Sequence, residues 1–195
     1  MRGNLFIISG PSGAGKGTLV VRILKELNNV WLSVSATTRD PRPDEVDGIH
    51  YFFVSDQRFD QLIEQNGLLE WASVHGCRYG TLRDEVIRRL ESGIDVILEI
   101  DPQGAFQVKE KLSDAILIFV MPPSMAELER RLRIRGTESC EQIAARLRAA
   151  KVEIFTKERY NSVVINDDLE KATNDLVEII MTARQAAIEQ ETDRV

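Results

Sequence analysis

Cysteine and histidine are scarce in this chain, which has only two of each among its 195 residues. Cys77 and Cys140 stand far apart, and neither has a partner at the spacing of a metal or redox site. His50 and His75 likewise lack partners at ligand spacing. The sequence therefore predicts no metal held by a cysteine and histidine cluster, and two reduced thiols, as expected in a cytoplasmic protein.

Long apolar runs and an excess of positive charge are also missing. The longest purely apolar run, Ala115 to Met121, is far too short to span a bilayer, and residues 1–9 do not resemble a signal peptide. With 25 basic and 31 acidic residues the formal net charge is −6, which disfavours a sequence-blind nucleic-acid binder. We expect a cytoplasmic protein without nucleic-acid or membrane partners.

Short apolar runs alternate with amphipathic stretches along most of the chain. This alternation predicts an α/β fold in which helices flank a central parallel sheet. Helix starts are expected where Thr81 with Asp84, Ser124 with Glu127, and Ser139 with Gln142 resemble capping boxes. A helix is expected over residues 18–27, and strands over residues 5–8, 31–35, 96–98, 115–120 and 162–166.

Two stretches interrupt this alternation within what we expect to be a single domain over residues 1–195. Residues 33–81 combine a Pro-rich loop with alternating strands and predict an inserted subdomain of mixed strands. Residues 126–149 are rich in arginine and predict a helical lid whose two helices meet near Gly136. The core is then expected to comprise about residues 1–32, 82–125 and 150–190.

A glycine-rich segment between the first strand and the first helix has the pattern of a phosphate-binding loop. Its glycines allow successive backbone N–H groups to point inward, and the lysine ammonium and the helix N-terminus add positive charge. Gly17 follows the lysine where the general motif has Ser or Thr, so Mg²⁺ is expected to depend more on water and phosphate oxygens. The segment comprises Gly10, Pro11, Ser12, Gly13, Ala14, Gly15, Lys16, Gly17 and Thr18.

Arginines and acids downstream of this loop suggest a second, phosphorylated substrate. Arg39 and Arg42 stand three apart on a Pro-stiffened loop and could grip one phosphate group. Glu99 and Asp101 close an apolar strand, where an acidic ligand or metal partner usually lies in a parallel sheet; the alternative is a plain strand terminus.

Together these residues resemble the guanylate kinase family of P-loop kinases, in family order from Ile7 to Asp168. Beyond the phosphate loop, the matching motifs are Ser35-x-Thr37-Thr38-Arg39-x-Pro41-Arg42, Gly48-x-x-Tyr51-x-Phe53, Glu70-Trp71, Tyr79-Gly80-Thr81, Asp101-x-Gln103-Gly104, Pro122-Pro123-Ser124, Arg131-x-x-x-Arg135-Gly136 and Val164-Ile165-Asn166-Asp167-Asp168.

The resemblance implies a role for each of these residues. Arg39, Arg42, Tyr51 and Tyr79 would hold the GMP phosphate, while Ser35, Glu70, Thr81 and Asp101 would surround the guanine. Arg131, Arg135 and Arg146 would cover the transferring phosphoryl group, and Asn166 and Asp167 would flank the ATP adenine. Alternatively, Arg131 and Arg135 pair with Glu127 and Glu138 on a solvated face.

The resemblance also implies the reaction, in which MgATP phosphorylates GMP, and by extension dGMP, to the diphosphate. Such transfer depends on positioning and charge stabilisation, which Lys16 and the arginines would supply. Two alternatives stay open: a non-catalytic phosphopeptide-binding module of the same fold, and a kinase acting on a phosphorylated ribose. The retained loop glycines and Lys16 argue against the first, and the pair of Glu70 and Ser35 against the second.

Overall fold

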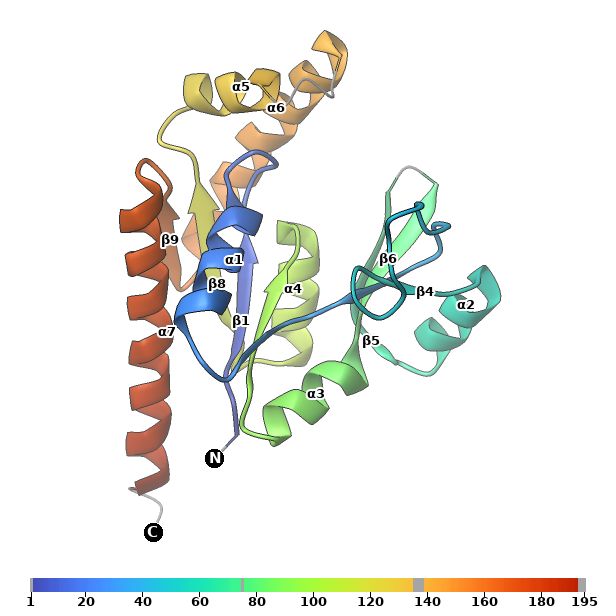
Figure 1. Ribbon diagram of the computed structural model, residues 1–195, viewed down its shortest axis with the longest axis vertical. Coiled ribbons are helices and arrows are strands. Elements are labelled where there is room, and N and C mark those ends of the chain that lie inside the picture. Colours follow the sequence, from blue (N-terminus) through green and yellow to red (C-terminus); the bar gives the residue numbers. More distant parts are fainter. Residues whose placement is uncertain (1, 75, 135–138, 193–195) are drawn as a thin grey trace.

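The computed structural model describes residues 2–74, 76–134 and 139–192. Five parallel strands form the central sheet in the order β2-β7-β1-β8-β9 (Figure 1). Because all five strands are parallel, their carboxyl ends share one edge, the usual position of a binding site in such sheets. The strands are β1 (Leu5–Ser9), β2 (Val30–Leu32), β7 (Asp95–Glu99), β8 (Ile116–Met121) and β9 (Ser162–Ile165).

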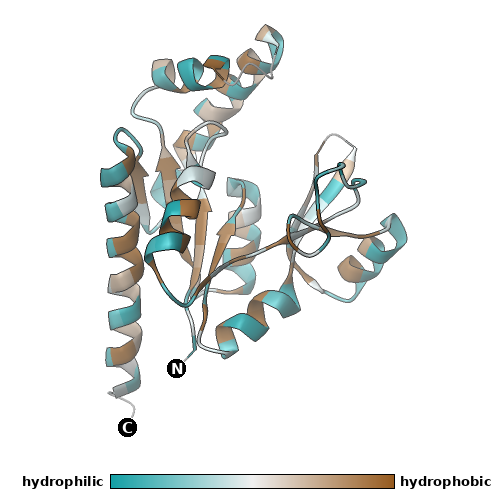
Figure 2. Ribbon diagram, viewed as in Figure 1, coloured by the Kyte–Doolittle hydropathy of each residue, from teal (hydrophilic) through white to brown (hydrophobic). Residues whose placement is uncertain are grey.

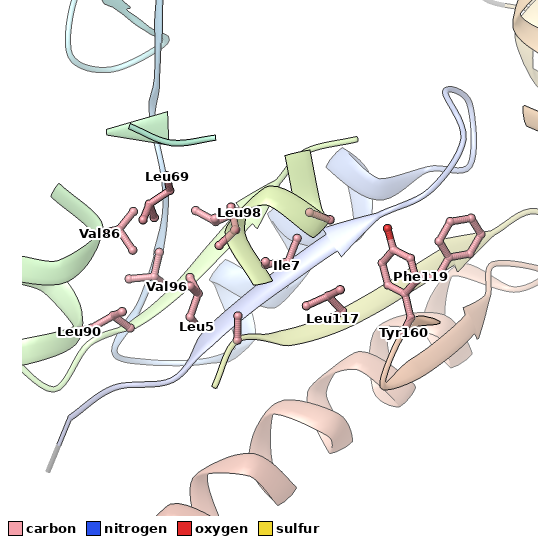
Figure 3. Packing of buried hydrophobic residues seen from close by; sticks show 13 residues of the cluster. Leu5, Ile7, Leu69, Val86, Leu90, Val96, Leu98, Leu117, Phe119 and Tyr160 are labelled. Carbon is pink, nitrogen blue, oxygen red and sulfur yellow. The ribbon is translucent and has the colours of Figure 1, made fainter. Parts of the chain in front are cut away.

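Alternate residues of β1 point to opposite faces of the sheet, and each face is covered by helices. Phe6 and Ile8 pack in one buried cluster with residues of α1 (Lys16–Glu26) and α7 (Leu169–Thr192). Leu5 and Ile7 pack on the other face with residues of α3 (Arg83–Glu91) and α4 (Pro102–Lys111), as Figure 3 shows. Figure 2 shows the resulting brown, hydrophobic sheet strands between helices of mixed polarity.

A second, mixed sheet lies beside the core, in the order β4-β3-β6-β5 (Figure 1). Its strands are β3 (Ser35–Thr37), β4 (Phe52–Phe53), β5 (Leu68–Val74) and β6 (Cys77–Leu82). The helix α2 (Asp56–Glu64) covers it with Phe59 and Leu62, which pack against Ala36 and Leu68 in a separate small cluster. This sheet therefore has a hydrophobic core of its own.

Two helices, α5 (Met125–Ile134) and α6 (Cys140–Phe155), pack together above the carboxyl edge of the central sheet (Figure 1). Leu128, Leu132, Ile143 and Ala150 form their shared buried cluster. The helix α6 continues beyond residue 149, and a 3₁₀ helix, η1 (Thr156–Arg159), connects it to β9. A single helix thus runs from the arginine-rich segment into the core.

Two local predictions were wrong. The strand expected over residues 31–35 is divided: β2 belongs to the parallel sheet, whereas Ser35 begins β3 in the mixed sheet. No Thr81 capping box forms, because α3 begins at Arg83 and Thr81 remains inside β6. The capping box of Ser139 and Gln142 is confirmed.

The meeting point expected near Gly136 lies outside the described residues. Within the described part of the chain, no helix combines the length and apolar character needed to cross a membrane.

Candidate active site

The glycine-rich segment forms a tight loop between β1 and α1, at the carboxyl edge of the sheet. Gly10, Gly13 and Gly15 have φ values of 140°, 92° and 95°, which side-chain-bearing residues rarely adopt. The helix begins at Lys16, so its positive N-terminus faces the loop. The Lys16 Nζ donates to the carbonyl oxygens of Gly10 at 2.5 Å and Pro11 at 3.2 Å.

Packing around the loop also requires glycine. A Cβ atom at residue 10 would lie 1.9 Å from the Val120 carbonyl oxygen, and one at residue 15 would lie 2.3 Å from Asn166 Nδ2. Asn166, at the end of β9, is buried and donates from Nδ2 to the Ala14 carbonyl at 2.8 Å. The residue that follows β9 therefore packs against the loop and donates a hydrogen bond to it.

Two clefts adjoin the loop. One, of about 320 Å³, is lined by loop residues from Ser12 to Thr18 together with Glu99. The other, of about 330 Å³, is lined by Gly13, Gly15, Thr18, Arg131, Asn166, Asp167 and Leu169. Phosphate-loop residues thus share a cleft with Asn166 and Asp167, although these two come from the far end of the chain.

Gly17 lies directly opposite the end of β7. A Cβ atom at residue 17 would stand 3.5 Å from a carboxylate oxygen of Glu99. Neighbouring protein atoms desolvate that carboxylate and raise its pKa, an effect that the Lys16 ammonium opposes. Glu99 therefore presents a carboxylate to the phosphate cleft.

Arginines of the predicted lid contact the loop. Arg146 Nη1 lies 2.5 Å from Ser12 Oγ, and Arg131 Nη2 donates to the Asn166 carbonyl at 2.9 Å. Arg131 also pairs with Glu127 at 2.8 Å, so the surface pairing considered above exists alongside the loop contact. Arg130 and Arg131 lower the pKa of Glu127 to about 2. Arg135 lies outside the described residues.

Arg39, Tyr51 and Tyr79 converge in the mixed sheet, on the side of the predicted phosphate acceptor. The rings of Tyr51 and Tyr79 have centroids 5.9 Å apart, and the Arg39 guanidinium lies 5.5 Å from the Tyr51 ring centroid. Arg42 is exposed on the adjoining loop. One cation, two hydroxyl-bearing rings and a second cation nearby suit a phosphate group.

Sequence reasoning missed Glu45, which shapes this arginine cluster. Both carboxylate oxygens of Glu45 lie 2.8 Å from Arg39 Nη2, and Oε2 also accepts from the Arg42 backbone N–H at 2.8 Å. The Arg42 N–H, followed by the Arg39 guanidinium, lowers the pKa of Glu45. No local motif marks this acid, because its role depends on how the loop turns back.

Glu70 and Thr81 form the buried polar centre of the predicted guanine site. Thr81 Oγ1 donates to Glu70 Oε1 at 2.6 Å, and Glu70 is only 6% exposed. Burial raises the pKa of Glu70, against the effect of the Thr81 hydrogen bond. Ser35 is opposite Thr81 in the register of β3 and β6, so three of the predicted guanine contacts lie together.

Asp101 and Gly104 bring α4 of the core to the same site. Asp101 caps α4 by accepting from the Gly104 N–H at 2.8 Å. A Cβ atom at residue 104 would lie 2.9 Å from Glu70 Oε2, so the glycine makes room for the carboxylate. The guanine site predicted from the mixed sheet therefore adjoins the core.

Comparison with known proteins assigns the chain to a family. The family model described as guanylate kinase matches residues 2–183. This chain belongs to the guanylate kinase family.

Individual relatives resemble this member of the family over most of its length. A guanylate kinase of Synechococcus sp. (strain CC9311) is 52% identical over 87% of this chain and 90% of its own length. One of Streptomyces coelicolor is 52% identical over 90% of this chain and 89% of its own. The crystal structure of guanylate kinase from Anaplasma phagocytophilum aligns with a TM-score of 0.74 at 33% identity, covering 93% of this chain and 86% of that one.

Proposed function

We propose that this guanylate kinase family member transfers the γ-phosphoryl group of ATP to GMP, giving ADP and GDP. The proposal rests on the combination of two features in one structure. One is a phosphate loop that carries Lys16, and the other is a separate site in which Thr81 donates a hydrogen bond to the buried acid Glu70. Family membership over residues 2–183 supports the same reaction.

The guanine edge explains why a buried carboxylate suits GMP. Guanine presents N1–H and N2–H as adjacent donors, and a carboxylate such as Glu70 can accept both. Adenine places an acceptor at N1, which would face the carboxylate's lone pairs. A site built around such bonds rejects the wrong partner by about 10⁴-fold or more. Arg39, Arg42, Tyr51 and Tyr79 would then hold the GMP phosphate.

Transfer itself needs positive charge and alignment rather than a covalent intermediate. Lys16 would neutralise charge that develops between the β- and γ-phosphates. Arg131 and Arg146 already contact the loop and its neighbour Asn166, and would cover the same phosphates together with Arg135. Asn166 and Asp167 would border the adenine.

Mg²⁺ bound together with ATP fits the cleft that Glu99 faces. The structure places a carboxylate opposite Gly17, where the general motif has a hydroxyl ligand. Oxygen ligands, with water and phosphate oxygens completing the set, are what Mg²⁺ prefers. Bound there, the ion would neutralise phosphate charge. Within the described residues, no group of three His, Cys, Asp or Glu side chains is arranged to hold a metal.

A coupled assay of ADP release from MgATP tests the proposal against GMP, dGMP, AMP, UMP, CMP and ribose bisphosphate. We expect kcat/KM for GMP to exceed that for AMP at least about a thousandfold. Lys16→Met should lose at least about a thousandfold in turnover while still binding GMP.

Lys25→Met is the matched control, because Lys25 is exposed in the last turn of the same helix. Faster turnover of a phosphorylated ribose than of GMP would replace the proposed acceptor. Binding of GMP with no turnover would instead favour the non-catalytic module.

A further inference from the structure

The lid helix α6 brings an acid, Glu153, toward the phosphate loop, and none of the roles above uses it. The contact of Arg146 with Ser12 shows which face of α6 points to the loop. Glu153 follows Arg146 by seven residues, which at 3.6 residues per turn leaves an offset of only about 20°. The two side chains therefore leave α6 on one face, about 10 Å apart along the axis.

Glu153 lies where α6 enters the core. The preceding turn contributes Ala150 to the buried cluster of the lid, and the next residue, Ile154, packs against the core cluster that contains Tyr160. The Glu153 side chain is half-buried between these contacts. Figure 3 shows the Tyr160 hydroxyl directed toward the end of β1, where the phosphate loop begins.

Glu153 is surrounded by charged and titratable groups from three other elements. The Lys16 ammonium attracts its carboxylate, and the Asp101 carboxylate, just before α4, repels it. The Tyr160 hydroxyl also interacts with it, but burial raises the Tyr160 pKa to about 12, which keeps that group neutral. Burial is the largest influence on Glu153 and raises its pKa.

Lys16 is thus attracted by two acids, Glu99 at the end of β7 and the half-buried Glu153 of α6. Its Nζ also donates to the Gly10 and Pro11 carbonyls. ATP phosphates require the same ammonium. Because a carboxylate attracts the Lys16 ammonium and repels phosphate, its charge opposes ATP binding.

We propose that Glu153 is a positioning residue that competes with the ATP phosphates for Lys16, drawing the ammonium back toward the loop until the nucleotide binds. The inference rests on the proposed role of Lys16 at the phosphates. The expected change in ATP affinity is unusual in direction, because removing the Glu153 charge should tighten ATP binding. Loss of a purely structural link between lid and core would leave ATP binding weaker or unchanged.

Binding of a non-hydrolysable ATP analogue with Mg²⁺, measured by calorimetry, tests this sign. Glu153→Gln keeps the shape and removes the charge, and should bind the analogue about three- to tenfold more tightly, the scale of one partly screened charge pair. The affinity for GMP should not change. Glu153→Asp keeps the charge and should remain close to wild type. Glu141→Gln, exposed in the first turn of the same helix, is the matched control.

The pH dependence separates charge from shape. As pH falls, Glu153 becomes protonated and no longer competes with the ATP phosphates for Lys16. The ratio of the wild-type Kd to the Glu153→Gln Kd should therefore approach one. Protonation of ATP affects both proteins and cancels from that ratio. A ratio that is constant with pH, or weaker binding by Glu153→Gln, would overturn the inference.

Failure of the inference can be told apart from failure of the proposed function. If Lys16→Met binds the analogue as tightly as wild type, Lys16 does not hold the phosphates, and both proposals fall. If the analogue needs Lys16 but Glu153→Gln binds no more tightly, only the role of Glu153 is lost.

Discussion

Thr81 and Glu70 are joined by a buried hydrogen bond between adjacent strands, with the Thr81 hydroxyl 2.6 Å from Glu70 Oε1. Thr81 is 1% exposed and Glu70 6%. Oε1 of Glu70 thus accepts the hydrogen bond from Thr81, while Oε2 lies near Gly104. The hydroxyl therefore sets the direction in which the acid can accept from a base.

Replacing Thr81 by Val should weaken GMP binding while sparing ATP. Valine keeps the branched shape but removes the donor that orients Glu70 toward the base, and a hydrogen bond to a charged group is worth about 1.5–3 kcal/mol. We expect the KM for GMP to rise at least about tenfold, since each 1.4 kcal/mol is a factor of ten. Thr81→Ser, which keeps the hydroxyl, is the control. Equal loss in both variants would point to strand packing rather than to the hydrogen bond.

The central sheet could be predicted from the sequence because its strands are apolar on both faces and its turns carry glycine. β1 and the loop after it show both signals within a few residues. The division of residues 31–35 could not be predicted. The Ser33 N–H still donates to the Ile97 carbonyl of β7, and the chain then crosses to pair Ser35 with Thr81. Only the presence of the second sheet decides where that strand ends.

The sequence motifs point to candidate site residues, whereas residues that support them through space carry no such signal. The motif around Asn166 predicts a contact with adenine, and the structure adds a hydrogen bond from its side chain to the Ala14 carbonyl that no spacing in the sequence reveals. The contact of Glu45 with Arg39 could not be predicted either, because it forms only when the loop folds back. The roles at bound nucleotides stay predictions.

Glu45→Gln should raise the KM for GMP by about three- to tenfold, on the scale of a lost charge-assisted contact. Glu45 joins the Arg39 side chain to the Arg42 backbone, so its charge fixes the loop that carries both arginines. Asp44→Asn, at the exposed neighbouring acid, is the control. Steady-state kinetics with varied GMP provide the measurement. A lower KM would mean that Glu45 mainly competes with the substrate phosphate.

Gly15→Ala should abolish most ATP binding through a clash with Asn166. The new Cβ would lie 2.3 Å from Asn166 Nδ2, and the φ of 95° adds backbone strain. Gly76→Ala is a closely matched control, since Gly76 has a φ of 81° and nothing within 4 Å of its Cβ position. Both variants should lose about 1–3 kcal/mol of stability from strain. Calorimetry should show weaker ATP binding, by at least about tenfold, in Gly15→Ala alone; a similar loss in both would remove Asn166 from the explanation.

Glu70→Gln should weaken catalysis and stabilise the fold at the same time. The amide retains an oxygen that accepts from Thr81, but its NH₂ group would face a guanine donor. We therefore expect kcat/KM for GMP to fall by about a hundredfold or more, with the KM for ATP little changed. If GMP kinetics survive, Asp101 becomes the next candidate for the guanine contact.

The stability effect follows from linkage. Burial raises the pKa of Glu70 in the folded protein, so the folded state binds its proton more readily than the unfolded chain. Wild-type stability should therefore fall as pH rises through that raised pKa, and Glu70→Gln should lack this loss. Glu70→Gln should therefore raise the Tm at neutral pH, by about 2–4 °C for each 1 kcal/mol gained. Thermal melts of both proteins across the acidic to neutral range measure the difference. A Tm gain at neutral pH that vanishes in acid would identify the ionised carboxylate as the destabilising group, whereas a gain independent of pH would assign it to packing.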